Sequence, residues 1–117
     1  MEIIFELSDD TLVASLYGEL DHHVAEKARK NIDSMMKQYG TKNLIFDFGK
    51  VTFMDSAGIG LVLGRYKKCK AEGGCTVIVS GTRRVRDILN LAGIFTLMAY
   101  ADTKEKGLEL LNGEEVS

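Results

Sequence analysis

The sequence predicts an α/β fold: a mainly parallel sheet with an antiparallel N-terminal edge strand, in the order β-β-α-β-α-β-α-β-α. Two observations carry this prediction. Short apolar runs of strand character alternate with longer amphipathic segments, which is typical of parallel strands joined by right-handed helical crossovers. The first two strands instead follow each other across a short polar turn, as in a hairpin. At 117 residues we expect one domain over 1–117.

The N-terminal half predicts a hairpin followed by a long helix. Residues 3–7 alternate in polarity, 12–17 form a second run of strand character, and Ser8-Asp9-Asp10 is the turn between them. Helical spacing then runs over His22–Tyr39 and stops at Gly40. One face of the first strand carries Ile3, Phe5 and Leu7. The apolar residues at helical spacing are Ala25, Ala28, Ile32, Met35 and Tyr39.

Two strand and helix units follow. Residues 44–48 form a nearly unbroken apolar run, typical of a strand covered on both faces, and a helix is predicted over 57–70, ended by Gly73-Gly74. The next strand is predicted over 75–79, and its helix begins after a Thr82 cap and closes near Gly93. The predicted inward residues are Ile59, Val62, Leu63 and Tyr66 on one helix and Val85, Ile88, Leu89 and Leu91 on the next.

The C-terminal part predicts one more strand and one more helix. A weaker strand lies within 95–100. Asp102 with Glu105 three residues later resembles a capping box, which predicts a last helix through Leu108 and Leu111.

Charge and composition exclude several classes of protein. With 15 basic and 17 acidic residues the net charge is −2, and the one basic cluster, 82–86, lacks interleaved aromatics, so we expect no nucleic-acid site and a solvated face there. No segment approaches the roughly 20 apolar residues of a membrane span. The acidic N-terminus is unlike a signal peptide, so we expect a cytoplasmic protein without membrane contact. Cys69 and Cys75 predict two free thiols.

The residues that carry enzyme chemistry do not gather into a known pattern. His22 and His23 are adjacent and point about 100° apart on a helix, so they cannot share a metal ion there. Ser56 lacks the Gly-x-Ser-x-Gly setting of a nucleophile elbow, because Met54 stands where the first glycine would be. We therefore expect no catalytic residue, no metal and no cofactor bound by the chain itself.

Gly58, Gly60 and Gly64 fall in a predicted helix, where each glycine costs about 1 kcal/mol relative to alanine. They resemble a dinucleotide fingerprint, but the third glycine falls one place late. Gly60 and Gly64 lie four residues apart on one helix face. Either the glycines let the helix pack closely within the domain, or they form a smooth surface for another protein.

Ser56 directly precedes this predicted helix. Its hydroxyl is placed to act as an N-cap. The same position suits a phosphate, because the free amides of Gly58 and Ile59 and the positive helix end can receive an anion. Asp55 can position the hydroxyl or favour the same helix end. Charge alone does not choose between a cap and a phosphorylation switch.

Four segments of the chain resemble one protein family, the STAS-domain anti-sigma factor antagonists of spore-forming bacteria. They are residues 18–23 (Gly-Glu-Leu-Asp-His-His), 53–60 (Phe-Met-Asp-Ser-Ala-Gly-Ile-Gly), 63–67 (Leu-Gly-Arg-Tyr-Lys) and 91–95 (Leu-Ala-Gly-Ile-Phe). The first and third segments are more similar to the sporulation members than to the general-stress members. The resemblance covers essentially the whole chain and implies a single STAS-like domain.

The resemblance implies a regulator rather than an enzyme. Its members bind an anti-sigma factor that is also a serine kinase, and so release a sporulation sigma factor. The kinase uses its own ATP to phosphorylate the serine that corresponds to Ser56, and a PP2C-type phosphatase reverses the reaction. The free protein is expected to be a monomer. The partner-facing residues implied are Asp21, Asp55, Ala57, Gly58, Ile59, Gly60, Leu61 and Gly64.

Two departures from the family pattern bear on this assignment. Ala57 stands where sporulation members often carry a second serine, so Ser56 has no adjacent rival as phosphate acceptor. Val24 stands where a threonine is common, which leaves Asp21 as the expected cap of the first helix. The alternatives are a general-stress antagonist and a STAS module with a small-molecule-sensing or transporter-type role.

Overall fold

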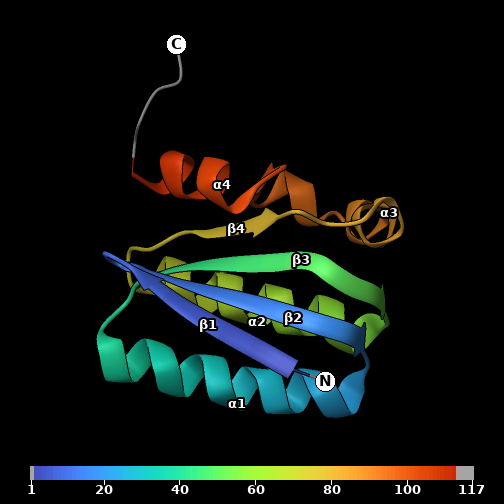
Figure 1. Ribbon diagram of the computed structural model, residues 1–117, viewed down its shortest axis with the longest axis horizontal. Coiled ribbons are helices and arrows are strands. Elements are labelled where there is room, and N and C mark those ends of the chain that lie inside the picture. Colours follow the sequence, from blue (N-terminus) through green and yellow to red (C-terminus); the bar gives the residue numbers. More distant parts are fainter. Residues whose placement is uncertain (1, 113–117) are drawn as a thin grey trace.

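The computed structural model describes residues 2–112 and confirms the predicted α/β class and element order (Figure 1). The strands are β1 (Glu2–Ser8), β2 (Thr11–Leu20), β3 (Asn43–Met54), β4 (Thr76–Val79) and β5 (Ala99–Ala101). The helices are α1 (His22–Tyr39), α2 (Ser56–Ala71), α3 (Arg83–Leu91) and α4 (Lys104–Leu111), with a 3-10 turn, η1 (Ile94–Thr96), before β5.

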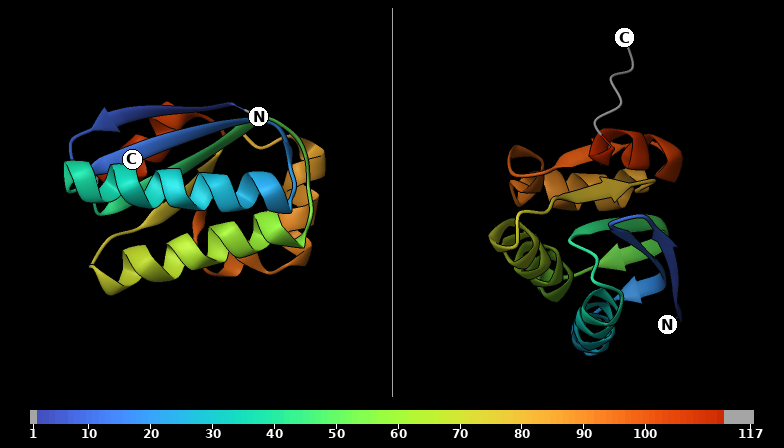
Figure 2. Two further views of the ribbon diagram at one scale, coloured as in Figure 1. Left: turned by 90° about the horizontal axis from the view of Figure 1, so that it is seen from below. Right: turned by 90° about the vertical axis from the view of Figure 1, so that its left-hand side faces the viewer.

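The five strands form one sheet in the order β1-β2-β3-β4-β5. β1 pairs antiparallel with β2, and every other pair is parallel. α1 and α2 lie side by side on one face of the sheet and α4 on the other (Figures 1 and 2). The larger core lies under α1, α2 and α3, whereas α4 covers a smaller cluster of Val13, Ile45, Val77, Val79 and Ala101. The helical crossovers therefore bury both faces of the parallel strands, as their apolar runs predict.

Local capping sets where most helices begin and end. The N–H of Val24 donates to Asp21 Oδ1 (3.0 Å) and that of Val85 to Thr82 Oγ1 (3.3 Å), so both predicted caps are confirmed. Gly40 ends α1 in the left-handed conformation (φ 65°), which glycine adopts without strain. At α4 the predicted Asp102 cap is wrong. The N–H of Lys106 donates to Thr103 Oγ1 (3.1 Å), because the helix begins one residue later.

The cap of α2 is also different from the predicted one. The N–H of Ala57 donates to Asp55 Oδ1 (2.8 Å), so Asp55 is the N-cap and Ser56 is the first helical residue. The N–H groups of Gly58 and Ile59 donate to the Asp55 carbonyl (3.1 and 3.3 Å). The amides that the sequence suggested were free for an anion are therefore already engaged within the helix.

Two strand boundaries differ from the sequence prediction. β3 continues to Met54, well beyond residue 48, because its C-terminal half pairs with β2 through a register irregularity. Residues 94–96 form a 3-10 turn, and the strand that pairs with β4 is 99–101, so only 99 and 100 of the predicted 95–100 region are in it.

The inward faces of the helices are partly different from the predicted ones. Leu91 was expected in the core and is 89% exposed, because α3 ends there and its inward face is Val85 and Leu89. Leu7 and Tyr39, each the last residue of its apolar set, are about half exposed. On α2 the buried residues are Gly58, Leu61, Val62, Arg65 and Cys69, whereas Ile59, Leu63 and Tyr66 pack at the edge of the core.

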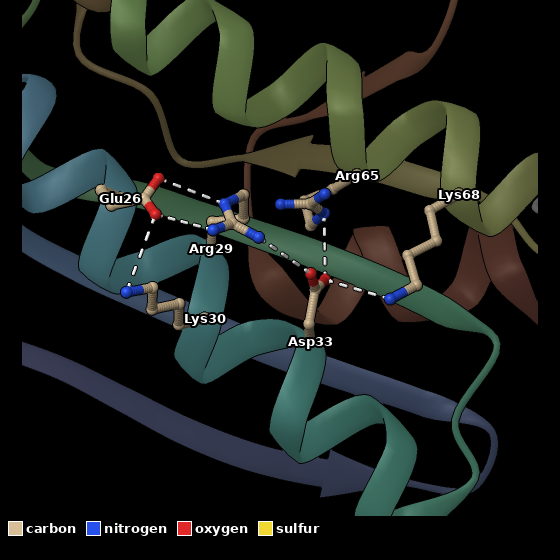
Figure 3. A network of polar contacts seen from close by, with 6 residues as sticks. All are labelled: Glu26, Arg29, Lys30, Asp33, Arg65 and Lys68. Carbon is tan, nitrogen blue, oxygen red and sulfur yellow. Dashed lines mark hydrogen bonds and ion pairs between the residues drawn. The ribbon is translucent and has the colours of Figure 1, made fainter.

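Arg65 is buried because α1 supplies a counterion. Its Nε lies 3.1 Å from Asp33 Oδ1, and Lys68 Nζ lies 3.5 Å from the same oxygen (Figure 3). Arg29 lies between Asp33 (3.9 Å) and Glu26 (2.7 Å). The Arg65 Nη1 is buried and has no hydrogen-bond partner within residues 2–112. This ion pair is the main polar contact between α1 and α2.

We expect Asp33→Ala to lower the free energy of unfolding by about 2 to 3 kcal/mol, since it leaves a buried guanidinium without its counterion. The double variant Asp33→Leu/Arg65→Met should recover most of that loss, because it also removes the unpartnered Nη1. Urea unfolding at pH 7 measures both. A double variant no more stable than Asp33→Ala would contradict this account of the contact.

We expect Asp55→Ala to lower the free energy of unfolding by about 1 kcal/mol through loss of the α2 cap. Ser56→Ala is the matched control, since Ser56 is inside the helix and should change stability by much less. The same urea experiment compares them. Equal losses for the two variants would show that Ser56 shares the capping role.

Candidate functional site

The ends of β2 and β3 bring two helix starts together. Leu20 pairs with Met54 as the last residue of each strand, and the N–H of Asp55 donates to the Leu20 carbonyl (3.4 Å). Asp21 and Asp55, the caps of α1 and α2, therefore follow neighbouring strand ends. This edge of a parallel sheet is where binding sites collect in open α/β folds.

Ser56 lies at this edge with an exposed side chain. Its hydroxyl makes no hydrogen bond within residues 2–112, because Asp55 supplies the cap. Asp21 is held by its own helix: the N–H of Val24 keeps the pKa of the Asp21 carboxyl below its usual value, against a smaller opposing effect of burial. The edge therefore presents an ionised carboxylate and an unengaged hydroxyl.

The α2 glycines have two different roles. A Cβ at Gly58 would lie 2.9 Å from Met54 Cβ and 3.2 Å from the Leu20 side chain, so this glycine allows close packing of α2 on the strand ends. A Cβ at Gly60 or Gly64 would meet nothing within 4 Å. The packing interpretation is therefore confirmed for Gly58. Gly60 and Gly64 leave an open surface, and its use by another protein stays a prediction.

A groove of about 420 Å³ lies between the first halves of α1 and α2. Small and apolar residues line it, namely Ala25, Ala57, Gly60 and Leu61, together with the polar residues His22, Glu26 and Arg29. Leu61 is only 5% exposed, so it contributes to the groove but also belongs to the core. Ala57, which follows Ser56 in the sequence, and Gly60 form the α2 side of the groove together with Leu61.

Of the eight predicted partner-facing residues, six are at least partly accessible, among them Asp55, and two, Gly58 and Leu61, are buried. Asp21, Ala57, Ile59 and Gly64 are at least partly accessible at this edge or along α2, and Gly60 is exposed. Gly58 is buried and has no side chain to offer. A glycine stands at this position because α2 packs closely on the ends of β2 and β3.

Sequence reasoning missed two features beside Ser56. The Arg84 guanidinium lies 5.3 Å from the ring centroid of Phe53, which is 37% exposed. Glu26 and Arg29, which line the groove, form an ion pair with each other. The spacing of Glu26 and Arg29 on a predicted helix was a usable signal. The contact of Arg84 with Phe53 joins α3 to the end of β3 and has no sequence signal.

Residues 2–112 hold no group of three or more His, Cys, Asp or Glu side chains placed to bind a metal ion. Cys69 and Cys75 are both free, as predicted. Within the same residues, no helix has the length and apolar character needed to cross a membrane.

Comparison with known proteins places this geometry in a family. The STAS domain model matches residues 2–107. The anti-sigma F factor antagonist of Lysinibacillus sphaericus is 34% identical over 104 residues, which cover 89% of this chain and 88% of that protein.

Solved structures agree with the sequence comparison. The unphosphorylated anti-sigma factor antagonist SpoIIAA matches with a TM-score of 0.83 at 34% identity, covering 96% of this chain and 97% of that one. SpoIIAA of Bacillus in its phosphorylated form matches with a TM-score of 0.74 at 33% identity, covering 93% and 98%. The family that the four segments resembled is thereby confirmed at the level of the domain, and the chain belongs to the STAS domain family.

Proposed function

We propose that this chain is an anti-sigma factor antagonist, a regulator rather than an enzyme. In its unphosphorylated form it binds an anti-sigma factor serine kinase, which releases a sporulation sigma factor. Phosphorylation of Ser56 ends the binding, and a PP2C-type phosphatase restores it. The names of the similar proteins support the antagonist role, and solved phosphorylated and unphosphorylated forms of SpoIIAA support a phosphorylation switch.

The observation that carries the proposal is the exposed Ser56 hydroxyl beside an open groove. A kinase must bring the γ-phosphate of its own ATP within bonding distance of the hydroxyl, which requires free space on the neighbouring surface. Gly60 and Gly64 provide that space. A serine with a purely structural role would give no reason for glycines on the exposed side of a helix.

Asp21 extends the proposed surface to α1. Its carboxylate is ionised and partly accessible beside the start of α2. A partner arginine or lysine would pair with it favourably at the edge of the interface. The surface therefore joins a charged contact at Asp21 to an apolar contact along the groove.

Phosphorylation should act on binding far more than on folding. A phosphate adds about −1.5 to −2 charges at the positive end of α2, which is favourable, but it lies next to the Asp55 carboxylate, which is unfavourable. These effects oppose each other within the domain. In a complex nothing offsets the charge, because a dianion must be desolvated against a surface that fits a hydroxyl.

We expect the phosphorylated protein to bind the kinase at least tenfold more weakly than the unmodified protein. A phosphate charge and an acidic group of the kinase about 5 Å apart would repel each other by about 3 kcal/mol at an effective dielectric of 20. A loss of about 1.4 kcal/mol already weakens the affinity tenfold. Ser56→Asp should weaken binding less than phosphorylation, and Ser56→Ala should bind but never switch off. Calorimetric titration of the kinase with each form, beside their melting curves, measures this.

Two results would overturn the switch. One is equal affinity of the phosphorylated and unmodified proteins. The other is a phosphate that peptide mapping places on Ser80 or Thr82 after incubation with the kinase and ATP. Incubation with a general-stress kinase in parallel tests the alternative antagonist role, which gains support if that kinase alone phosphorylates Ser56.

We expect Gly60→Ala to raise the stability of the free protein and weaken kinase binding. The added methyl has open space around it and improves helix propensity by about 0.5 to 1 kcal/mol. The same methyl would stand in the proposed interface and reduce affinity at least tenfold. Lys67→Ala, an exposed position near the other end of α2, is the control and should leave affinity unchanged. Undiminished affinity of Gly60→Ala would remove the α2 surface from the interface.

A further inference from the structure

A second cavity lies between α3, η1 and β5, and the proposed function does not use it. Its volume is about 500 Å³, and its lining residues are Arg83, Arg86, Asp87, Asn90, Phe95 and Tyr100. This is within the range of small-molecule sites in proteins. None of these residues lines the groove between α1 and α2.

The charges of the two arginines that line this cavity are not balanced by ion pairs in the described part of the chain. Within residues 2–112 neither Arg83 nor Arg86 forms an ion pair, although Asp87 lies on the same helix. They stand three residues apart in the first turns of α3, where like charges repel and cations oppose the helix dipole. With Asp87 as the one carboxylate against two guanidinium groups, the lining keeps an excess positive charge. An anion bound in the cavity would relieve that repulsion.

The remaining wall of the cavity is aromatic and fixed in position. Phe95 and Tyr100 meet edge to face with ring centroids 5.5 Å apart, and the Tyr100 hydroxyl donates to the Gly81 carbonyl (3.3 Å). The Arg86 guanidinium lies 5.7 Å from the centroid of the Tyr100 ring. Planar guanidinium and aromatic faces side by side suit a planar ligand, since both stack favourably on a ring.

We propose that this cavity binds a small aromatic anion, meaning a ring that carries a carboxylate or a phosphate. Arg83 and Arg86 hold the anionic group, Asn90 offers an amide to a polar substituent, and Phe95 and Tyr100 contact the ring. A small molecule would then bind the domain at a place separate from the proposed protein-binding surface. The inference does not depend on the proposed role of Ser56.

Arg84 provides a matched control on the same helix. It carries the same charge one residue from Arg83 but does not line the cavity, because its guanidinium lies over Phe53 instead. All three arginines are exposed, so their replacement by glutamine should leave the fold intact. The variants Arg83→Gln/Arg86→Gln and Arg84→Gln then separate a specific site from a general effect of positive charge.

The test is an NMR titration of the 15N-labelled full chain with four probes. Phenyl phosphate and benzoate carry both a ring and a charge, ethyl phosphate carries the charge without a ring, and benzyl alcohol carries the ring without a charge. We expect the amides of Arg86, Phe95 and Tyr100 to shift with phenyl phosphate or benzoate, at an affinity at least tenfold higher than for ethyl phosphate or benzyl alcohol. The tighter of the first two probes identifies the anionic group.

The variants decide whether this binding belongs to the cavity. Arg83→Gln/Arg86→Gln should weaken the tighter probe at least tenfold, whereas Arg84→Gln should leave its affinity within twofold. The proposal fails if neither aromatic anion binds. It also fails if ethyl phosphate binds as tightly, which would indicate a simple anion patch, or if Arg84→Gln is as damaging as the double variant.

Discussion

The parallel pairing of β2 with β3 is the constraint on which the rest of this structure depends. Because the two strands end at the paired residues Leu20 and Met54, the chain leaves the sheet twice at the same edge and starts a helix each time. Each helix start needs a side chain to accept a first-turn N–H, and an aspartate fills that need in both places. The two carboxylates, and Ser56 beside one of them, are therefore neighbours as a consequence of backbone pairing.

The packing of α1 against α2 then determines which surface remains open. Gly58 lets α2 approach the strand ends, and the ion pair between Arg65 and Asp33 holds the helices together further along. Between these two contacts the helices leave the groove that Gly60 lines. Next to the end of β3, α3 extends Arg84 toward Phe53, while its other arginines line a separate cavity. The groove between α1 and α2 and the cavity beside α3 therefore have different lining residues.

Local patterns in the sequence determined the element order, the hairpin and most helix limits. These features depend on residues close together in the chain: alternation in a strand, spacing of three and four in a helix, a cap such as Asp21 or Thr82, and a glycine such as Gly40 after the last turn. The family resemblance also came from the sequence, because its segments are contiguous. Ser56 was singled out on the same ground.

Only the tertiary structure decided the features that depend on contacts between residues distant in the sequence. Polarity alone predicts that Arg65 is exposed, but Asp33 from another helix makes its burial possible. Leu91 is apolar, but the domain places no element over it. Three glycines in one helix look equivalent, and their separation into packing and open positions depends on where Leu20 and Met54 lie. The sequence specifies each residue's chemistry, whereas burial depends on partners that the fold brings from elsewhere.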